Sequence, residues 1–526
     1  MIATSQSLAS AAGLNVLQNG GHAVDAAITA AGVLAVVEPS MNGIGGDLLA
    51  IVWDASAAKL FGLDAIGRSA YAATAEEYAR RGLTAMPASG PLAVDVPGVV
   101  DGWHQLLARF GTMSLAQALA PAIRYARDGF PVQEIIAADW NESALRLAQD
   151  AAAARTFLPN GRAPRHGEIF VNPRLAASLE RIAADGRDAF YRGSIARAMV
   201  ADMRARGGLL DDRDFADHQS TWVEPLHTNY RGVDVYELPP STQGFVALEM
   251  LNILEGIEVR ALGHNTANYL HLVSEAKKIA FADRSAYLAD RDTIPPQAID
   301  TLVSKGYAAE RRQEIDWKKA GRYQPADLAA RPPVRPDVVF TGSDRGDTVY
   351  LTVADGRGNV ISLIQSLFAS FGAGIVAGDT GIALHNRGSG FTLAPGHPNQ
   401  LAPHKRPLHT LVPAMVLRNG RPWVSFGVMG GDNQAQAHAQ IVTKLVDFDM
   451  NIQQAGESAR MRHGANELYL ESAIGDEVRT DLASRGHTVV DGRAMMGGFQ
   501  GILIDPESGV LMGGSDPRKD GLAIGW

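Results

Sequence analysis

A threonine lies between a polar loop and the first of two aliphatic runs. Residues 341–346 are polar and contain glycine, Asp347 and Thr348 follow, and two β-branched runs then flank a turn that contains glycine. This pattern predicts a β-hairpin that begins at the threonine. If the chain is cut before Thr348, the new α-amine, whose ordinary pKa is about 7.7–8.0, can act as the base for the neighbouring hydroxyl. The pattern therefore suits an N-terminal threonine nucleophile, and it also suits an ordinary strand threonine.

The composition is that of a globular chain and excludes several functions. The 526 residues are 46% hydrophobic and 20% charged, which is enough for two or more packed layers or domains. With 57 acidic against 48 basic residues the net charge is −9, so nothing supports nucleic-acid binding. The chain has no cysteine, which excludes disulfides, thiolate metal sites and a cysteine nucleophile.

The start of the chain predicts neither export nor membrane insertion. The first seven residues have no basic start and no apolar core, so they do not resemble a signal peptide. The apolar stretch over residues 26–37 is too short to span a bilayer. We therefore expect a soluble, cytoplasmic protein with no membrane partner, and export of a longer form stays open.

Periodicity and turn residues predict an α+β chain without internal repeats. Helices are expected over residues 7–18, 23–37, 247–256, 266–287, 434–446 and 452–459, with mostly helical periodicity over 101–210. Strands are expected over residues 48–53, 60–64, 233–236, 349–354, 360–366, 414–417 and 423–428, and in a closing hairpin of 501–505 with 510–514. Residues 291–345 are rich in Pro, Arg, Asp and Gly, and we expect them to form a surface connection that is loosely ordered towards its end and leads to Thr348.

No motif predicts a cofactor or a metal. The glycine run at 43–46 is followed by no Lys-Ser/Thr pair and lacks the dinucleotide-binding spacing, so tight backbone packing is the better interpretation. Four histidines lie close in sequence, but their spacing matches no zinc motif; they are His385, His397, His404 and His409.

Short motifs recur in order along nearly the whole chain. They are GGHAVDAA at 20–27, GIGGD at 43–47, VPGVV at 96–100, ARDGF at 126–130, PPSTQG at 239–244, ADR at 282–284, FGAGIVAG at 371–378, KRPL at 405–408, MGG at 429–431 and GSDPR at 514–518. Together they resemble the γ-glutamyltransferase family of N-terminal-nucleophile hydrolases.

The resemblance implies a four-layer αββα sandwich and a chain that cuts itself. Thr348 would attack the carbonyl of Asp347, the acyl group would shift from nitrogen to oxygen, and water would release the fragments 1–347 and 348–526. The two fragments would stay associated as one woven body. The new N-terminal threonine would then form an acyl-enzyme with a small amide substrate, and no cofactor is implied. A homodimer of these heterodimers is left open.

The resemblance also implies roles for three further residues. Gly430 and Gly431 match paired glycines whose backbone N–H groups stabilise the oxyanion, and Ser366 aligns with a hydroxyl residue that orients the nucleophile. From the local sequence alone, the glycines could also form a tight turn and Ser366 could be an ordinary strand serine.

Substrate recognition is where the chain departs from the family pattern. The family aspartate that holds the γ-glutamyl ammonium is replaced by Gly390, its asparagine by Phe368, and its paired serines by His409 and Thr410. The carboxylate-binding arginine is also missing from its position, although Arg68 lies two residues further on. Loss of a charge-assisted contact to a buried ammonium costs about 1.5–3 kcal/mol, so we expect a poor γ-glutamyl site.

Four polar residues suit a different, anionic acyl group, such as oxamate or a dicarboxylic monoamide: Arg68, Arg387, His409 and Thr410. A surface arginine and a packed histidine are the alternatives for Arg387 and His409. Only residues 400–404 stand where many family members carry a longer lid loop, which favours hydrolysis over transfer.

These observations lead to one main hypothesis and two alternatives. The main hypothesis is a self-processing N-terminal threonine amidohydrolase that acts on small anionic acyl amides. Within it, oxamate-like or dicarboxylic amides rank before γ-glutamyl compounds such as glutathione, and a glutaryl-cephalosporin side chain ranks third. One alternative is a γ-glutamyltransferase or glutathione hydrolase proper. The other is a non-catalytic relative that serves in binding or assembly.

Overall fold

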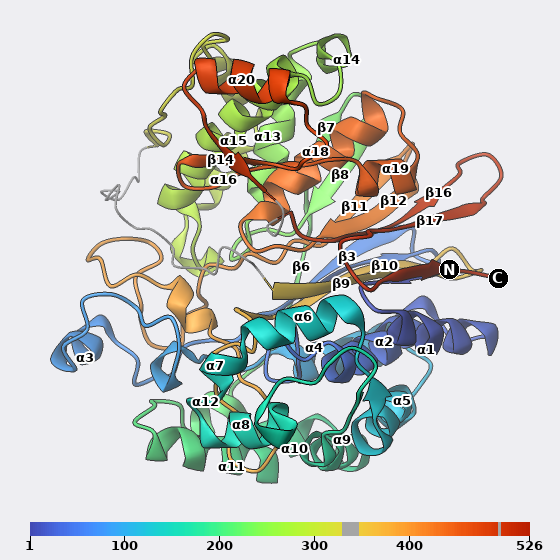
Figure 1. The fold of residues 1–526 in the computed structure, drawn as a ribbon, viewed down its shortest axis with the longest axis vertical. Coiled ribbons are helices and arrows are strands. Elements are labelled where there is room, and N and C mark those ends of the chain that lie inside the picture. Colours follow the sequence, from blue (N-terminus) through green and yellow to red (C-terminus); the bar gives the residue numbers. More distant parts are fainter. Residues whose placement is uncertain (329–346, 493–495) are drawn as a thin grey trace.

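Two antiparallel β-sheets form the centre of the computed structural model, and helices cover their outer faces (Figure 1). The structure describes residues 1–328, 347–492 and 496–526. The first sheet has the strand order β18-β1-β9-β10-β2-β3-β6. Its strands are β1 (Ile2–Thr4), β2 (Asp47–Asp54), β3 (Lys59–Ala65), β6 (Thr221–Val223), β9 (Asp347–Ala354), β10 (Val360–Phe368) and β18 (Leu522–Ile524).

The second sheet has the strand order β17-β16-β12-β11-β8-β7. Its strands are β7 (Leu226–Tyr230), β8 (Val233–Glu237), β11 (Ala414–Arg418), β12 (Arg421–Val428), β16 (Phe499–Ile504) and β17 (Leu511–Ser515). Two small sheets lie outside this centre and contain β4 (Phe130–Pro131) with β5 (Ile169–Phe170), and β13 (Met461–His463), β14 (Glu467–Leu470) and β15 (Thr488–Asp491).

One group of helices lies below the first sheet in Figure 1 and a second group lies above the second sheet. The lower group contains α1 (Ser7–Gln18), α2 (Ala23–Val37), α3 (Ala75–Arg80), α4 (Val99–Phe110), α5 (Leu115–Asp128), α6 (Glu134–Glu142), α7 (Ala144–Leu147), α8 (Ala151–Phe157), α9 (Pro173–Asp185), α10 (Arg187–Tyr191), α11 (Ser194–Ala205) and α12 (Asp212–Ala216). The upper group contains α13 (Gly244–Glu255), α14 (Val259–Leu262), α15 (Ala267–Tyr287), α16 (Pro296–Leu302), α17 (Lys305–Arg312), α18 (Asn433–Val446), α19 (Ile452–Glu457) and α20 (Asp476–Ser484).

The apolar residues of β2 explain how the layers are held together. Successive strand side chains point to opposite faces of a sheet. Leu48 and Ala50 enter the core that the first sheet shares with the lower helices, whereas Leu49 and Ile51 pack with Tyr350 between the two sheets. Both faces of β2 are therefore buried, which is why its sequence is a continuous apolar run.

The glycine run at 43–46 packs tightly, as its sequence predicted. A Cβ atom on Gly45 would lie 2.1 Å from the carbonyl oxygen of Ala383, and one on Gly46 would lie 2.3 Å from the carbonyl oxygen of Ser366. These contacts leave no room for a side chain. The run thus brings the start of β2 against the end of β10, where Ser366 is located.

The predicted mixture of helices and strands is confirmed, and the predictions over residues 7–18 and 23–37 match α1 and α2 at both ends. One expectation was wrong in part. Residues 291–328 are not merely a loose connection, because α16 and α17 form there, with Leu302 and Ala308 buried in the upper core. The remainder of that predicted connection, residues 329–345, lies outside the described residues. None of the described helices is long and apolar enough to cross a lipid bilayer.

Candidate active site

Thr348 lies near the start of β9, opposite a bulge in β10. Val349 pairs with Gln365 and Asp347 pairs with Phe368, so Ser366 and the residue after it share the position opposite Thr348. A β-bulge of this kind re-aims side chains and is common beside active sites. The Thr348 side chain is buried, with 2% exposure.

The bulge brings two predicted catalytic side chains together. The Thr348 hydroxyl donates a hydrogen bond to the Ser366 Oγ at 3.2 Å, and the backbone N–H of Phe368 donates to the same oxygen at 2.8 Å. Phe368 has a φ of 78°, which is uncommon for a residue with a side chain. Since such outliers persist only where the surroundings hold them, this turn indicates a precisely held site.

Gly430 and Gly431 follow β12 with φ values of 120° and 56°. Their carbonyl oxygens accept hydrogen bonds from the backbone N–H groups of Asn433 at 2.9 Å and Gln434 at 3.2 Å. Within the described residues, neither glycine N–H donates a hydrogen bond. Both N–H groups are thus available to an oxyanion, and the positive φ values are ones that glycine adopts without strain.

A buried arginine lies beside this centre. Arg387, in the 3-10 helix Arg387–Gly390, is 1% exposed, and its Nη1 donates to the Thr410 Oγ1 at 3.0 Å. The guanidinium lies over the ring of Phe368, 4.4 Å from the ring centroid. Its Nε and Nη2 have no hydrogen-bond acceptor among the described residues. Burial lowers the pKa of Arg387 to about 9, against the opposing charges of Asp47 and Asp432.

Buried donors without acceptors are costly, and a buried cation is costlier still. The arrangement around Arg387 is therefore what a carboxylate-binding pocket requires before its ligand arrives. A carboxylate can accept two parallel hydrogen bonds from a guanidinium, and Arg387 has two unused nitrogens for this purpose.

His409 is a packed histidine whose two ring nitrogens are both engaged. Its Nδ1 accepts from the N–H of Leu411 at 3.2 Å, so the proton is on Nε2, which donates to the Asp47 Oδ2 at 3.2 Å. The other oxygen of Asp47 accepts from the N–H groups of Gly67 and Gly98, each at 3.1 Å. Burial holds the pKa of His409 well below its ordinary value and raises the pKa of Asp47 to about 7.

The remaining sequence candidates lie in different surroundings. The Arg68 Nη1 donates to the carbonyl oxygen of His404 at 3.0 Å and lies 3.4 Å from Asp290, and its Nη2 lies 3.8 Å from Asp292. The guanidinium of Arg68 is therefore paired with carboxylates, unlike that of Arg387. Gly390 is buried, and a Cβ added there would lie 3.2 Å from the carbonyl oxygen of Leu408.

Two residues without a predicted role also belong to this region. Gln243 donates through Nε2 to the carbonyl oxygens of Thr410 at 2.8 Å and Gly431 at 3.1 Å, so it links the arginine pocket to the glycine turn. Asp47 holds His409. Asp47 ends the motif GIGGD and Gln243 is the residue before the last in PPSTQG, and membership of these motifs was the only signal that could have identified them.

Within the described ranges, one cluster has the composition of a metal site, formed by His271, Glu275 and His487. The Nε2 of His271 donates to the carbonyl oxygen of Asp316, so its Nδ1 accepts from the Nε2 of His487, at 2.8 Å. The ammonium of Lys278 lies 2.5 Å from the Glu275 Oε1. These groups satisfy one another, and the geometry gives no reason to place an ion there.

Comparison with known proteins gives consistent results along the whole chain. The family model for gamma-glutamyltranspeptidase matches residues 9–526. A glutathione hydrolase-like proenzyme of Bacillus subtilis is 38% identical, with 100% of this chain and 98% of the relative covered. An oxamate amidohydrolase proenzyme of Klebsiella pneumoniae is 34% identical, with 99% and 97% covered.

A solved structure gives the same result for the fold. The cephalosporin acylase from Bacillus halodurans superposes with a TM-score of 0.92 and 39% sequence identity, with 100% of this chain and 95% of that chain covered. The family match, the full-length relatives and this shared structure agree. The chain therefore belongs to the gamma-glutamyltranspeptidase family and is an enzyme that acts on carbon–nitrogen bonds.

Proposed function

We propose that this chain is a self-processing amidohydrolase that removes a small anionic acyl group from an amide. The observation that carries the proposal is the buried guanidinium of Arg387, which has two unused nitrogens. It lies over the ring of Phe368, and the backbone N–H of Phe368 holds Ser366, the partner of Thr348. An anionic acyl group would supply the acceptors that Arg387 lacks. Its amide carbon would then be held near the nucleophile.

Processing uses the same hydroxyl as catalysis. The Thr348 Oγ attacks the carbonyl carbon of Asp347, the peptide C–N bond breaks, and the proton passes to the freed α-amine. Water then hydrolyses the resulting ester and releases the carboxyl of Asp347. The α-amine of Thr348 becomes the general base, and the hydrogen bond to Ser366 orients the hydroxyl.

Turnover follows by acyl transfer to the threonine. The Thr348 Oγ attacks the substrate amide, the N–H groups of Gly430 and Gly431 stabilise the oxyanion, and the amine leaves with a proton from the α-amine. Water then attacks the ester and releases the acid. Unused N–H groups at both glycines support this role.

The fold supports two fragments that stay associated after the cut. In the first sheet β1 lies between β18 and β9, and in the second sheet β11 pairs with β8, so strands from 1–347 and 348–526 are paired with each other in both sheets. Helices outside both sheets, and an apolar core between them, support the four-layer αββα arrangement (Figure 1). Separation would break strand pairing in two sheets.

The acyl group is proposed to be oxamate-like or a dicarboxylic monoamide. The name of one relative, an oxamate amidohydrolase, supports a small acidic acyl group. A γ-glutamyl group would bring an ammonium as well, and Gly390 offers it no carboxylate. Because one relative is named glutathione hydrolase-like, a γ-glutamyl group is the second candidate.

Mass spectrometry and one matched substrate pair test the proposal. Wild-type protein should give two masses that correspond to a cut before Thr348, and Thr348→Ala should stay at full length. Glutaryl 4-nitroanilide and γ-glutamyl 4-nitroanilide differ only by the α-amine, and we expect faster hydrolysis of the first. Oxamate is assayed by ammonia release. A wild-type chain that remains uncut and inert would instead support a non-catalytic relative.

A further inference from the structure

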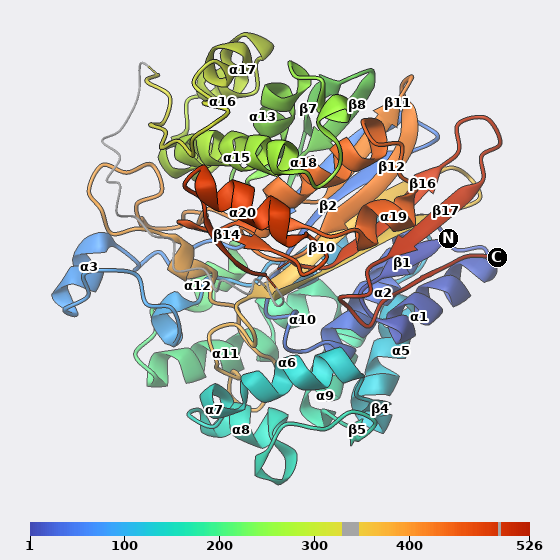
Figure 2. The same ribbon diagram turned by 45° about the horizontal axis from the view of Figure 1, so that its top comes forward.

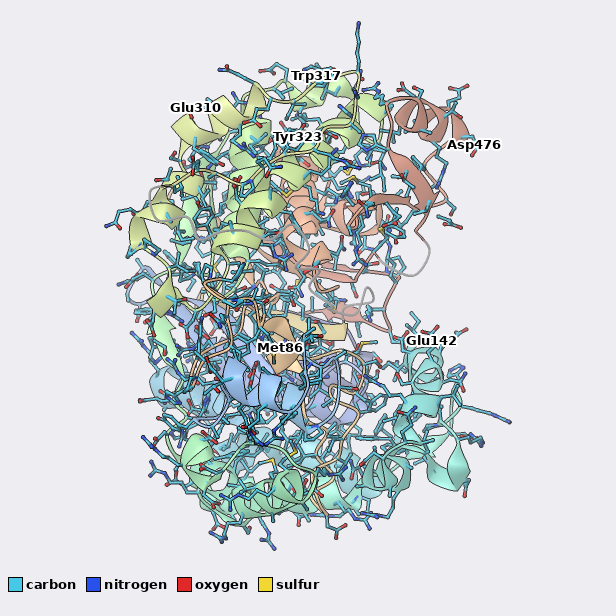
Figure 3. All side chains as sticks on the ribbon, turned by 90° about the vertical axis from the view of Figure 1, so that its left-hand side faces the viewer. Met86, Glu142, Glu310, Trp317, Tyr323 and Asp476 are labelled. Carbon is cyan, nitrogen blue, oxygen red and sulfur yellow. The ribbon has the colours of Figure 1, made fainter. Side chains whose placement is uncertain are left out.

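A polar cavity is lined by Asp432, the residue that directly follows the glycine turn. Its volume is about 640 Å³, and it lies between α15, the start of α18, and the β13–β14 turn. Figure 2 shows α15 beside α20 and β14 in this half of the molecule, and Tyr323, which also lines the cavity, is labelled in Figure 3. We call it the basic pocket, after the charged residues that line it, which are Lys277, Lys278, Arg284, Arg322, Asp432 and Arg462.

Two of these cations already have carboxylate partners. The Lys278 ammonium lies 2.5 Å from the Glu275 Oε1, and the Arg284 Nη2 lies 2.5 Å from the Asp432 Oδ1. Asp432 is the only carboxylate among the described residues that line the pocket. The lining therefore carries more positive than negative charge.

Lys277 is a buried cation of this pocket whose contacts are with neutral groups. Its side chain is 5% exposed, and Nζ donates to the carbonyl oxygen of Gly464 at 2.9 Å and lies 3.3 Å from the His463 Nδ1. Nζ also lies 4.0 Å from the centroid of the Phe281 ring. Within the described residues no carboxylate forms a salt bridge with it. A buried ammonium that contacts only neutral groups favours the binding of an anion.

The electrostatics of Lys277 agree with this geometry. Its pKa is lowered to about 7, chiefly by burial; the charge of Asp432 opposes this shift, and the charges of Arg284, Arg462 and Lys278 contribute to it. A bound carboxylate would add a second opposing charge and restore the charged ammonium. The pocket is thus better suited to an anionic ligand than to a neutral or cationic one.

Asp432 connects the basic pocket to the reaction centre. It directly follows Gly431, and its charge acts on Arg387 as well as on Arg284 and Lys277. The basic pocket thus begins one residue beyond the glycine turn, and Gln243 links that turn to Thr410, which Arg387 contacts. An amide whose carbonyl oxygen binds at that turn has an acyl side and an amine side, and Arg387 accounts for the acyl side.

We propose that the basic pocket receives the leaving amine and selects amines that carry a carboxylate, with Lys277 and Arg322 as the residues that bind this carboxylate. The inference rests on the proposed function for its account of the acyl side. Arg322 is exposed at the rim of the pocket, where it can meet a ligand as it enters. The ligand class is a primary amine with one carboxylate, released by amide hydrolysis.

A binding experiment on the processed protein tests this without any need for turnover. Isothermal titration calorimetry at pH 7 would compare 4-aminobenzoate with aniline, which differ only by the carboxylate. We expect 4-aminobenzoate to bind at least about fivefold more tightly, because its carboxylate can form an ion pair with the pocket cations that is partly shielded from water. Lys277→Gln and Arg322→Gln should each reduce this preference about threefold or more. Lys319→Gln is the matched control, because Lys319 is exposed and outside the pocket.

The outcomes separate the two proposals. Equal binding of the two amines by wild type overturns the inference, and so does a preference that both pocket variants retain. Arg322→Gln keeps the test valid if Lys277→Gln does not fold, since Arg322 is on the surface. If the carboxylate preference depends on these residues but no amide is hydrolysed, the proposed function fails and the anion pocket stands. If amides are hydrolysed without any preference, only the inference fails.

Discussion

The hydroxyl of Thr348 is hydrogen-bonded to the hydroxyl of Ser366 at 3.2 Å while the peptide bond before Thr348 is still intact. Ser366 is itself held by the N–H of Phe368, in a bulge against which Gly46, the residue before β2, packs closely. The orientation of the Thr348 hydroxyl, which we propose as the nucleophile, therefore does not depend on cleavage. We infer that one side-chain geometry serves both proposed steps, self-processing and turnover.

Ser366→Ala should slow self-processing by about tenfold or more, because the threonine hydroxyl loses the partner that orients it. The rate is measured by gel or mass analysis of freshly made chain over time. Ser362→Ala is the matched control on the same strand, since Ser362 is buried and hydrogen-bonded to the Tyr350 hydroxyl at 2.7 Å. Equal processing rates in the two variants would contradict an orienting role for Ser366.

Gly430→Ala should reduce kcat by about 10²–10³-fold, because alanine cannot hold a φ of 120° and the N–H would turn away from the oxyanion. Gly420→Ala provides the comparison. Gly420 has a φ of 72° in the turn between β11 and β12, with open space around its Cα. It also has a positive φ but lies outside the site. If both variants lose activity equally, backbone strain rather than a lost oxyanion donor is the cause.

Arg387→Lys should lower kcat/KM for glutaryl 4-nitroanilide by about tenfold or more, since lysine cannot replace a paired guanidinium–carboxylate contact. Hydrolysis of the uncharged butyryl 4-nitroanilide should change less, so the ratio of the two rates is the measurement. Arg68→Lys tests the other arginine candidate. Because Arg68 is paired with Asp290, we expect its substitution to leave that ratio unchanged. The reverse result would place the acyl carboxylate at Arg68.

Glu38→Gln should remove a pH-dependent loss of stability. Glu38 is 1% exposed with a hydrogen bond from the Ser5 hydroxyl at 2.6 Å, and burial raises its pKa to about 8 from an ordinary 4.5. A raised folded-state pKa stabilises the protein below pH 4.5, and this stabilisation is lost as the pH rises through about 8.

We therefore expect the melting temperature of wild type to fall relative to that of Glu38→Gln by about 2–5 °C between pH 5 and pH 8. Thermal unfolding across that range is the measurement. Glu310→Gln is the control, because Glu310 is exposed on α17 (Figure 3). Parallel curves for wild type and Glu38→Gln would mean that Glu38 is ionised in the folded protein.

Local patterns were sufficient to predict much of the architecture. Helices α1 and α2 and the hairpin of β9 and β10 follow from apolar periodicity and turn residues, which depend on neighbours within a few positions. The ordered motifs were sufficient to identify the family, which the full-length match confirms. The helices α16 and α17 were missed because a segment rich in Pro and charged residues can still fold when one apolar face, including Leu302, docks onto a core built by other segments.

The electrostatics of the site were decided only by the tertiary structure. Nothing in the sequence near Arg387 shows that its guanidinium is buried over Phe368 with two unused donors, or that Arg68 is paired with Asp290. The hydrogen bond from His409 to Asp47 joins residues 362 positions apart. The sequence by itself determined which side chains are present and how each short segment is built. Burial and long-range pairing set the charge and the free donors of those side chains, and both depend on groups that the chain brings together only when it folds.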